Sequence, residues 1–251
     1  MNKINGMAFC HMNQYPNRPT IVFLHDSLGS IELWRNLPNE LAAVTKCNVL
    51  VYDRLGYGKS DPMLTSIRSK NYLEVEADIL IDLLIDLKID KPILLGHSDG
   101  GSIALIVAGK YPNQIKGAII EAGHIFVEEI TLRGIYDAKK AYETTNLPNR
   151  LKKYHGDKTE TIFKAWTETW ISKDFKNWNI EHFVSNIVVP ILFIQGKNDE
   201  YGTLEQVDKT LDLVKGKSDK FIIPDVGHTP HKEIPDLFLE TVKEFILRIE
   251  K

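Results

Sequence analysis

Residues 96–100 (GHSDG) match the pattern G-x-S-x-G, and they lie between two apolar runs, 93–95 and 103–108. If the first run is a buried strand and the second a buried helix, the serine occupies a sharp turn. Side chains at the two flanking glycines would then collide with the strand or with the helix. The turn projects the Ser98 hydroxyl outward near the N-terminus of the helix, where backbone N–H groups are unpaired. This context predicts that Ser98 is a nucleophile.

A serine hydroxyl is a weak nucleophile until a base accepts its proton, and the base is usually a histidine held in one tautomer by a carboxylate. Asp199 follows the apolar run 191–194, and His228 follows the last apolar run, 221–223. Both runs are read as strands, so both side chains are expected at the same edge of a sheet. We therefore predict that Ser98, Asp199 and His228 form a catalytic triad.

Neighbouring residues compete with these assignments. Glu200 could replace Asp199 as the acid, and Asp225 could also be confused with it. His231 competes with His228, but His228 directly follows a glycine after a strand. His231 lies beyond a proline at the approach to a helix, so His228 is the preferred base.

Attack on a carbonyl carbon produces an oxyanion, which needs preorganised hydrogen-bond donors. We expect one donor to be the backbone N–H of Asp99, the residue after the nucleophile. The second is expected from the loop after the apolar run 20–24, where Ser27 is preferred and Asp26 is the alternative. The Asp26 carboxylate is predicted either to contact substrate or to accept hydrogen bonds from nearby loop N–H groups.

These loops all follow segments that read as strands of one sheet. Short apolar, β-branched runs predict buried parallel strands at 20–24, 48–52, 93–95, 115–120, 191–194 and 221–223. Helical spacing of apolar residues predicts helices at 31–45, 72–87, 103–108, 204–214 and 235–249. Strands that alternate with helices predict an α/β fold with a mostly parallel sheet and helices on both faces. Residues 1–14 could add one or two edge strands, and ligands should bind at the carboxyl ends of the strands.

The alternation stops between residues 125 and 188, where several amphipathic helical segments occur without a convincing strand. We therefore predict a core domain from residues 1–124 and 189–251, with a helical cap inserted at 125–188. Three of the four tryptophans lie in this insertion. Trp166 and Trp170 are candidates for contact with substrate, although a tryptophan here could equally fill the packing of the cap itself.

The composition is that of an ordinary globular enzyme, with 43% hydrophobic and 26% charged residues. A net charge of −3 and scattered basic residues give no reason to expect nucleic acid or an anionic membrane as a partner. Met1–Tyr15 has no apolar signal core, and the two cysteines, Cys10 and Cys47, have no metal-ligand spacing. We expect a cytoplasmic protein without a disulfide, and the sequence predicts no oligomeric state.

With these motifs in place, the chain resembles the α/β-hydrolase superfamily. The resemblance rests on the loop at His25, on residues 53–60 (DRLGYGKS), on the turn at Ser98 and on residues 227–235 (GHTPHKEIP). Within the superfamily the chain is similar to the valacyclovir hydrolase (biphenyl hydrolase-like) group and to carbon–carbon bond hydrolases of aromatic degradation. Asp26 is a departure, because many relatives have glycine after the histidine.

The resemblance implies a serine hydrolase that needs no metal or organic cofactor. Its expected substrate is a small carboxylic ester, with a carbon–carbon bond or a lactone as the alternative. A ligand-binding protein on the same fold is a further alternative from another class. In the valacyclovir hydrolase group the acidic residue after the nucleophile binds the amino group of the substrate, and Asp99 matches that position. The competing explanation is that the Asp99 carboxylate stabilises the helix N-terminus.

Overall fold

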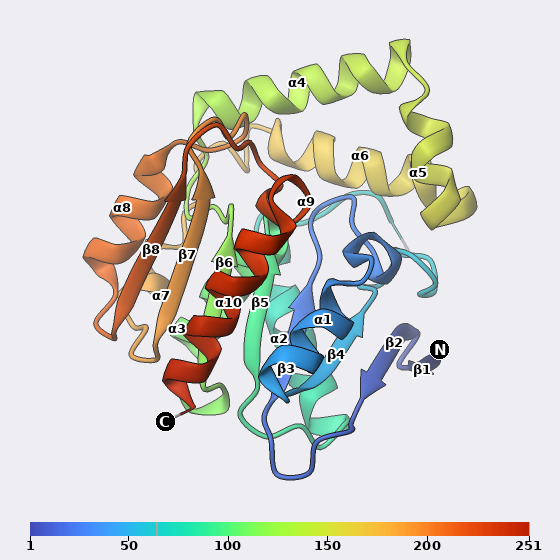
Figure 1. The fold of residues 1–251 in the computed structure, drawn as a ribbon. Coiled ribbons are helices and arrows are strands. Elements are labelled where there is room, and N and C mark those ends of the chain that lie inside the picture. Colours follow the sequence, from blue (N-terminus) through green and yellow to red (C-terminus); the bar gives the residue numbers. More distant parts are fainter. Residues whose placement is uncertain (64, 251) are drawn as a thin grey trace.

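The computed structural model describes residues 1–63 and 65–250, and its central feature is an eight-stranded sheet (Figure 1). The strands are β1 (Asn2–Ile4), β2 (Met7–Met12), β3 (Thr20–Leu24), β4 (Asn48–Tyr52), β5 (Ile93–His97), β6 (Gly117–Glu121), β7 (Ile191–Gly196) and β8 (Ser218–Ile223). Their order in the sheet is β1-β2-β4-β3-β5-β6-β7-β8. Strands β3 to β8 pair in parallel, whereas β1 and β2 form an antiparallel hairpin at one edge. The predicted α/β fold with a mostly parallel sheet is confirmed.

Helices cover both faces of this sheet because its central strands are apolar on both sides. The longer core helices are α1 (Leu37–Thr45), α2 (Tyr72–Asp86), α3 (Asp99–Lys110), α8 (Leu204–Leu213) and α10 (Pro235–Ile249). Val22 and Leu24 of β3 pack into the core that contains α2, α3 and the short helix α7 (Glu181–Val184). Ile21 and Phe23 of the same strand pack into the opposite core, with α1 and α10.

One predicted helix differs from the structure. The expected helix 31–45 is divided into a 3-10 turn, Ile31–Trp34, and the α-helix α1. Arg35 adopts a positive φ of 52° between the two segments, and Pro38 lies in the first turn of α1. A proline has no N–H to continue the hydrogen bonding of a preceding turn, so the periodic apolar pattern hid a break.

Three helices, α4 (Glu129–Thr144), α5 (Leu147–His155) and α6 (Thr159–Trp170), lie above the carboxyl ends of the strands (Figure 1). The chain leaves the core at Ile125 and returns at Ile180, and the Ile180 N–H donates to the Ile125 carbonyl at 2.8 Å. Helix α7 follows this return and packs against α3. The predicted domain limits, with a cap at 125–188, stay a prediction, and residue 251 lies outside the described residues.

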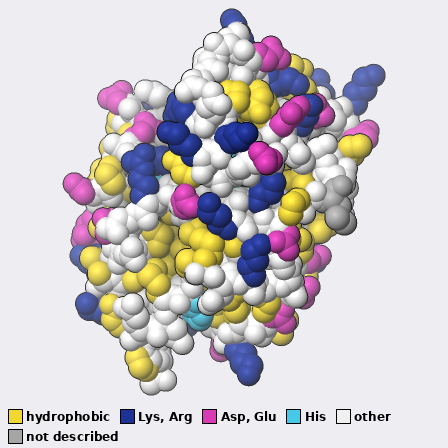
Figure 2. All heavy atoms as spheres, turned by 90° about the vertical axis from the view of Figure 1, so that its right-hand side faces the viewer, with side chains coloured by type: hydrophobic (Ala, Val, Ile, Leu, Met, Phe, Trp, Pro, Cys, Tyr) yellow, Lys and Arg dark blue, Asp and Glu magenta, His cyan; other side chains and the backbone are white. Residues whose placement is uncertain are grey.

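Charged side chains of both signs are mixed over the face that Figure 2 shows, without a stripe of one sign. Within residues 1–63 and 65–250, the helices all fall short of the length and apolarity needed to cross a membrane. Cys47 is buried and Cys10 is half-buried.

Candidate active site

The turn at Ser98 joins β5 directly to α3. Ser98 has φ 54° and ψ −117°, a backbone conformation that a non-glycine residue rarely adopts. A side chain at Gly96 would overlap the carbonyl group of Gly100, and one at Gly100 would overlap the carbonyl group of Leu24. The two glycines therefore permit the close approach of strand and helix that the sharp turn requires.

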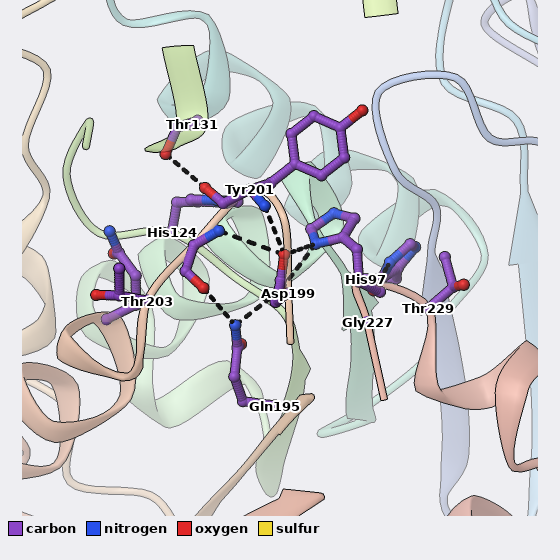
Figure 3. A network of polar contacts seen from close by, with 12 residues as sticks. His97, His124, Thr131, Gln195, Asp199, Tyr201, Thr203, Gly227 and Thr229 are labelled. Carbon is purple, nitrogen blue, oxygen red and sulfur yellow. Dashed lines mark hydrogen bonds and ion pairs between the residues drawn. The ribbon is translucent and has the colours of Figure 1, made fainter. Parts of the chain in front are cut away.

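Asp199 and His228 lie side by side at the ends of β7 and β8. The His228 Nδ1 is 2.9 Å from each carboxylate oxygen of Asp199. Asp199 also accepts hydrogen bonds from the Gln195 amide at 2.7 Å and from the Tyr201 N–H at 2.8 Å (Figure 3). These donors fix the carboxylate, which in turn orients the imidazole with its Nε2 edge free to face a reacting group.

Ser98 and His228 both line a cavity of about 190 Å³ beneath the α4–α6 helices. The predicted residues Asp26, Ser27, Asp99, Trp166 and Trp170 also line it. Asp199 lies behind the imidazole instead. No hydrogen bond joins the serine hydroxyl to this imidazole among the residues that the structure describes. Such contacts are often long before substrate binds.

The rival residues lie in different surroundings. Glu200 lines the same cavity but is exposed, and Asp225 is exposed in the turn before His228. His231 is buried and its imidazole contacts Glu121 rather than Asp199. The geometry therefore pairs the preferred acid with the preferred base, whereas His231 pairs with Glu121.

The charges of this pair reinforce each other. Burial disfavours the His228 imidazolium, but the Asp199 carboxylate and its hydrogen bond raise the pKa of His228 above its ordinary value. Burial also opposes ionisation of Asp199, yet the charge and hydrogen bond of His228 lower the pKa of that carboxyl. Asp199 is thus an anion that stabilises a proton on the neighbouring imidazole.

Two backbone N–H groups at the cavity have no acceptor among the described residues. The Asp99 N–H lies in the first turn of α3, where no carbonyl of the helix can reach it. The Ser27 N–H lies in the loop after β3. Both residues line the cavity that also holds Ser98, so the loop and the helix each bring one candidate donor for an oxyanion to this cavity.

Asp26 places a negative charge next to this region. Burial would raise the pKa of its carboxyl, but His97, Lys232 and His25 together lower it to about 2. The carboxylate therefore stays charged at neutral pH, half-buried in the cavity lining. Its role, substrate contact or support of the loop, stays a prediction.

The Asp99 carboxylate is engaged by the protein itself. The Tyr72 hydroxyl donates to it at 3.1 Å, and the guanidinium of Arg54 lies 3.6 Å away. Trp170 joins this network because its indole N–H donates to the Tyr72 hydroxyl at 2.9 Å. The carboxylate is only 3% exposed, so the buried Arg54 balances its charge. Arg54 belongs to the polar loop 53–60 after the strand β4, but the sequence pattern assigned no role to its side chain.

The helices above the sheet are fastened to two of the strand-end loops. The His155 imidazole, at the end of α5, accepts from the Gly58 N–H at 3.0 Å and donates to the Leu28 carbonyl at 2.9 Å. Lys158 donates to the carbonyl groups of Gly58 and Ser60. Since Leu28 adjoins Ser27, this attachment reaches the loop that supplies a backbone donor to the cavity.

Other residues of the cavity were missed by sequence reasoning. His124 donates from Nε2 to the Tyr201 carbonyl at 3.1 Å, and Thr131 donates to the same carbonyl at 2.6 Å (Figure 3). His124 had a signal, because it follows the strand β6 in a polar loop. Thr131 and Ile135 had none, since their position depends on how α4 lies over the sheet.

This fold and the geometry at its carboxyl edge define an α/β-hydrolase. The family model of the alpha/beta hydrolase fold matches residues 19–186, so the chain belongs to this family of hydrolases. The predicted resemblance to the biphenyl hydrolase-like group is also confirmed. The chain is 28% identical to the human serine hydrolase BPHL over 97% of its own length and 84% of the relative.

Two further similarities show how widely the family varies. A proline iminopeptidase of Saccharolobus solfataricus is 28% identical over 79% of this chain and 76% of the relative. The crystal structure of the enol-lactonase from Burkholderia xenovorans LB400 superposes with a TM-score of 0.75 at 20% identity, covering 96% of each chain. The activities in these two names differ, whereas the fold is shared.

Proposed function

We propose that the protein is a serine hydrolase that cleaves a small carboxylic ester through an acyl-enzyme on Ser98. The observation that supports this most is the hydrogen-bonded Asp199–His228 pair, because its histidine lines the same cavity as Ser98 in the strained turn. The similarity to the serine hydrolase BPHL supports the same reaction class.

In the proposed mechanism the Ser98 Oγ attacks the ester carbonyl carbon while His228 Nε2 takes the hydroxyl proton. The negative charge moves to the carbonyl oxygen, which the N–H groups of Ser27 and Asp99 bind. The intermediate collapses as the alcohol leaves with the proton from His228. Water then attacks the acyl-enzyme with the same base, and the acid departs as Ser98 regains its proton.

The size of the cavity supports a small substrate. About 190 Å³ is below the range of about 300–1,000 Å³ that is usual for pockets of drug-sized ligands. Trp166 and Trp170 are proposed to contact the apolar part of the substrate. A lactone or a carbon–carbon bond next to a carbonyl stays the alternative substrate, because the same groups could act on it.

Asp99 is the residue through which a cationic substrate group would be recognised by analogy with the valacyclovir hydrolase group. Its contacts with Arg54 and Tyr72 support a different role, in which the carboxylate holds the buried guanidinium beneath the cavity. Comparison of an amino-acid ester with its des-amino analogue separates the two. A preference for the amino ester that disappears in Asp99→Asn would support substrate recognition.

The proposal is tested with a panel of p-nitrophenyl esters, lactones and ring-cleavage diketones, together with a fluorophosphonate probe. We expect ester turnover and labelling in the wild type, and a loss of kcat on the order of 10⁴- to 10⁶-fold in Ser98→Ala. A protein that turns over none of these substrates and is not labelled would instead favour a ligand-binding function. Undiminished turnover in Ser98→Ala would place the reaction elsewhere. A cytoplasmic location is likewise proposed.

A further inference from the structure

A second acid–histidine pair lies buried beside the proposed triad. Glu121 ends β6 and is fully buried, and its carboxylate accepts from the backbone N–H of His231 at 2.8 Å. The His231 Nδ1 is also 2.8 Å from each of its oxygens. His231 lies in the short helix α9 (Pro230–Glu233), three residues after His228. Neither member of the pair lines the cavity, so neither is placed to contact a substrate.

Glu121 also contacts the turn that holds the nucleophile. Its backbone carbonyl accepts from the Ser98 N–H at 2.9 Å. The neighbouring His97 donates from Nε2 to the carbonyl of His228 at 2.9 Å. The ring centroid of His97 is 5.0 Å from those of both His228 and His231. One strand end thus touches both the serine turn and the segment with the base.

The negative charge of Glu121 strengthens its contact with His231. Burial opposes ionisation of Glu121, but His231 and His97 lower the pKa of its carboxyl, so it is an anion. A buried carboxylate that loses its donors is strongly destabilised, and hydrogen bonds to an ionised group are short and strong. Movement of His231 away from Glu121 is therefore costly, and this restrains the segment that begins at His228.

His97, Glu121 and His231 each offer one atom that could bind a metal ion, and these three atoms lie within 4.8 Å of one another. One nitrogen of each histidine, however, already faces an oxygen atom at hydrogen-bond distance: His97 Nε2 faces the His228 carbonyl, and His231 Nδ1 faces the Glu121 carboxylate. His97 Nε2 faces a carbonyl, which only accepts, so this nitrogen has a proton and is no metal ligand. The contacts favour a network of hydrogen bonds that restrains the backbone.

We propose that Glu121 is a positioning residue: acting through His231, it holds the backbone of His228 so that the imidazole meets both Asp199 and Ser98. This inference rests on the proposed function. It differs from a general contribution to stability, because it predicts a change in the properties of the base itself. If the segment loosens, the contact that raises the pKa of His228 weakens in the folded enzyme.

The test compares Glu121→Ala and Glu121→Gln with the wild type on a p-nitrophenyl ester. We expect kcat to fall about 10- to 100-fold in Glu121→Ala, because small displacements of catalytic groups have effects of this size, while KM stays within about twofold. The acidic limb of kcat/KM should move to lower pH. Glu121→Gln keeps an acceptor for the His231 N–H, so this variant should retain most of the wild-type kcat.

A matched control removes another acid far from the cavity. Glu250 pairs with Arg18 and Lys116 near the amino ends of the strands and is 8% exposed. Glu250→Ala should lower the melting temperature without moving the acidic limb. If Glu121→Ala does not fold, the double variant Glu121→Leu with His231→Leu removes both polar side chains and avoids an unpaired buried charge. It should fold and still lose kcat.

The outcomes separate this inference from the proposed function. Wild-type turnover that survives in Ser98→Ala would overturn the proposed function. Turnover that depends on Ser98, together with an unchanged kcat and an unchanged acidic limb in folded Glu121→Ala or in the double variant, would overturn only the positioning role. A loss of kcat in these variants without movement of the acidic limb would overturn it as well.

Discussion

The carboxyl edge of the sheet and the helices α4–α6 above it form the two sides of the same cavity, but they are built differently. At the sheet edge, Asp199 has partners from three neighbouring residues at 2.7–2.9 Å. The helices contribute mostly apolar groups, with Ile135 and the indoles of Trp166 and Trp170 in the lining. The sheet edge therefore determines what reaction is possible, and the helices determine what fits.

The two sides should also differ in how well they tolerate substitution. Hydrogen-bonded groups at strand ends are fixed by the main chain, so one altered atom disturbs several contacts. Aromatic side chains on a helix pack without strict direction and tolerate substitution by residues of similar size. The comparison predicts that changes at the sheet edge lower kcat, whereas changes on the helices alter KM and substrate preference.

After removal of the Ser98 hydroxyl itself, the largest expected effect is that of Asp199→Asn. The amide cannot stabilise an imidazolium, and it favours the wrong imidazole tautomer, so kcat should fall about 10⁴-fold. Asp225→Asn is the matched control, because this exposed residue has a positive φ of 57° that asparagine tolerates. Steady-state kinetics of the two variants on one p-nitrophenyl ester provide the measurement.

The pH profile sharpens this prediction. The base must be neutral to accept a proton, and Asp199 raises the pKa of His228 above the ordinary histidine value. At pH values below this raised pKa, kcat/KM of the wild type should therefore fall tenfold per pH unit. In Asp199→Asn this limb should move to lower pH. Equal losses in Asp225→Asn and Asp199→Asn, or a limb that stays in place, would contradict the assignment of the acid.

A smaller effect is expected where the two sides are joined. His155→Ala leaves the Gly58 N–H and the Leu28 carbonyl without their partner, which loosens the loop that includes Ser27. We expect kcat to fall about 10-fold, since the oxyanion donor is displaced rather than lost. His155→Gln can both accept and donate and should retain most activity. Equal kcat in the wild type and the alanine variant would show that the two sides act independently.

The same contrast explains which parts of the site could be predicted from the sequence. The turn at Ser98 and the strand ends before Asp199 and His228 follow from local patterns, because glycines and apolar runs determine them within a few residues. The Arg54–Asp99 contact and the Glu121–His231 pair could not be predicted, since each joins segments that become neighbours only through the strand order. The placement of helices α4–α6 over the sheet could not be predicted either, because amphipathic spacing does not specify which element an apolar helix face packs against.

The smallest effect is expected from Trp166→Ala. Trp166 is half-buried in the lining, and its ring centroid is 6.1 Å from that of Tyr201. It makes no hydrogen bond with the residues of the proposed triad. Removing the indole enlarges the cavity, so KM for a short acyl ester should rise about three- to tenfold, as lost apolar contact of roughly 1 kcal/mol implies, while kcat changes little. The kcat/KM for esters with longer acyl chains should rise relative to that for esters with short ones. A series of p-nitrophenyl esters of increasing chain length measures this, with Trp166→Phe as the conservative control. An unchanged chain-length preference, or a kcat loss as large as that of Asp199→Asn, would mean that the helices do not select the substrate.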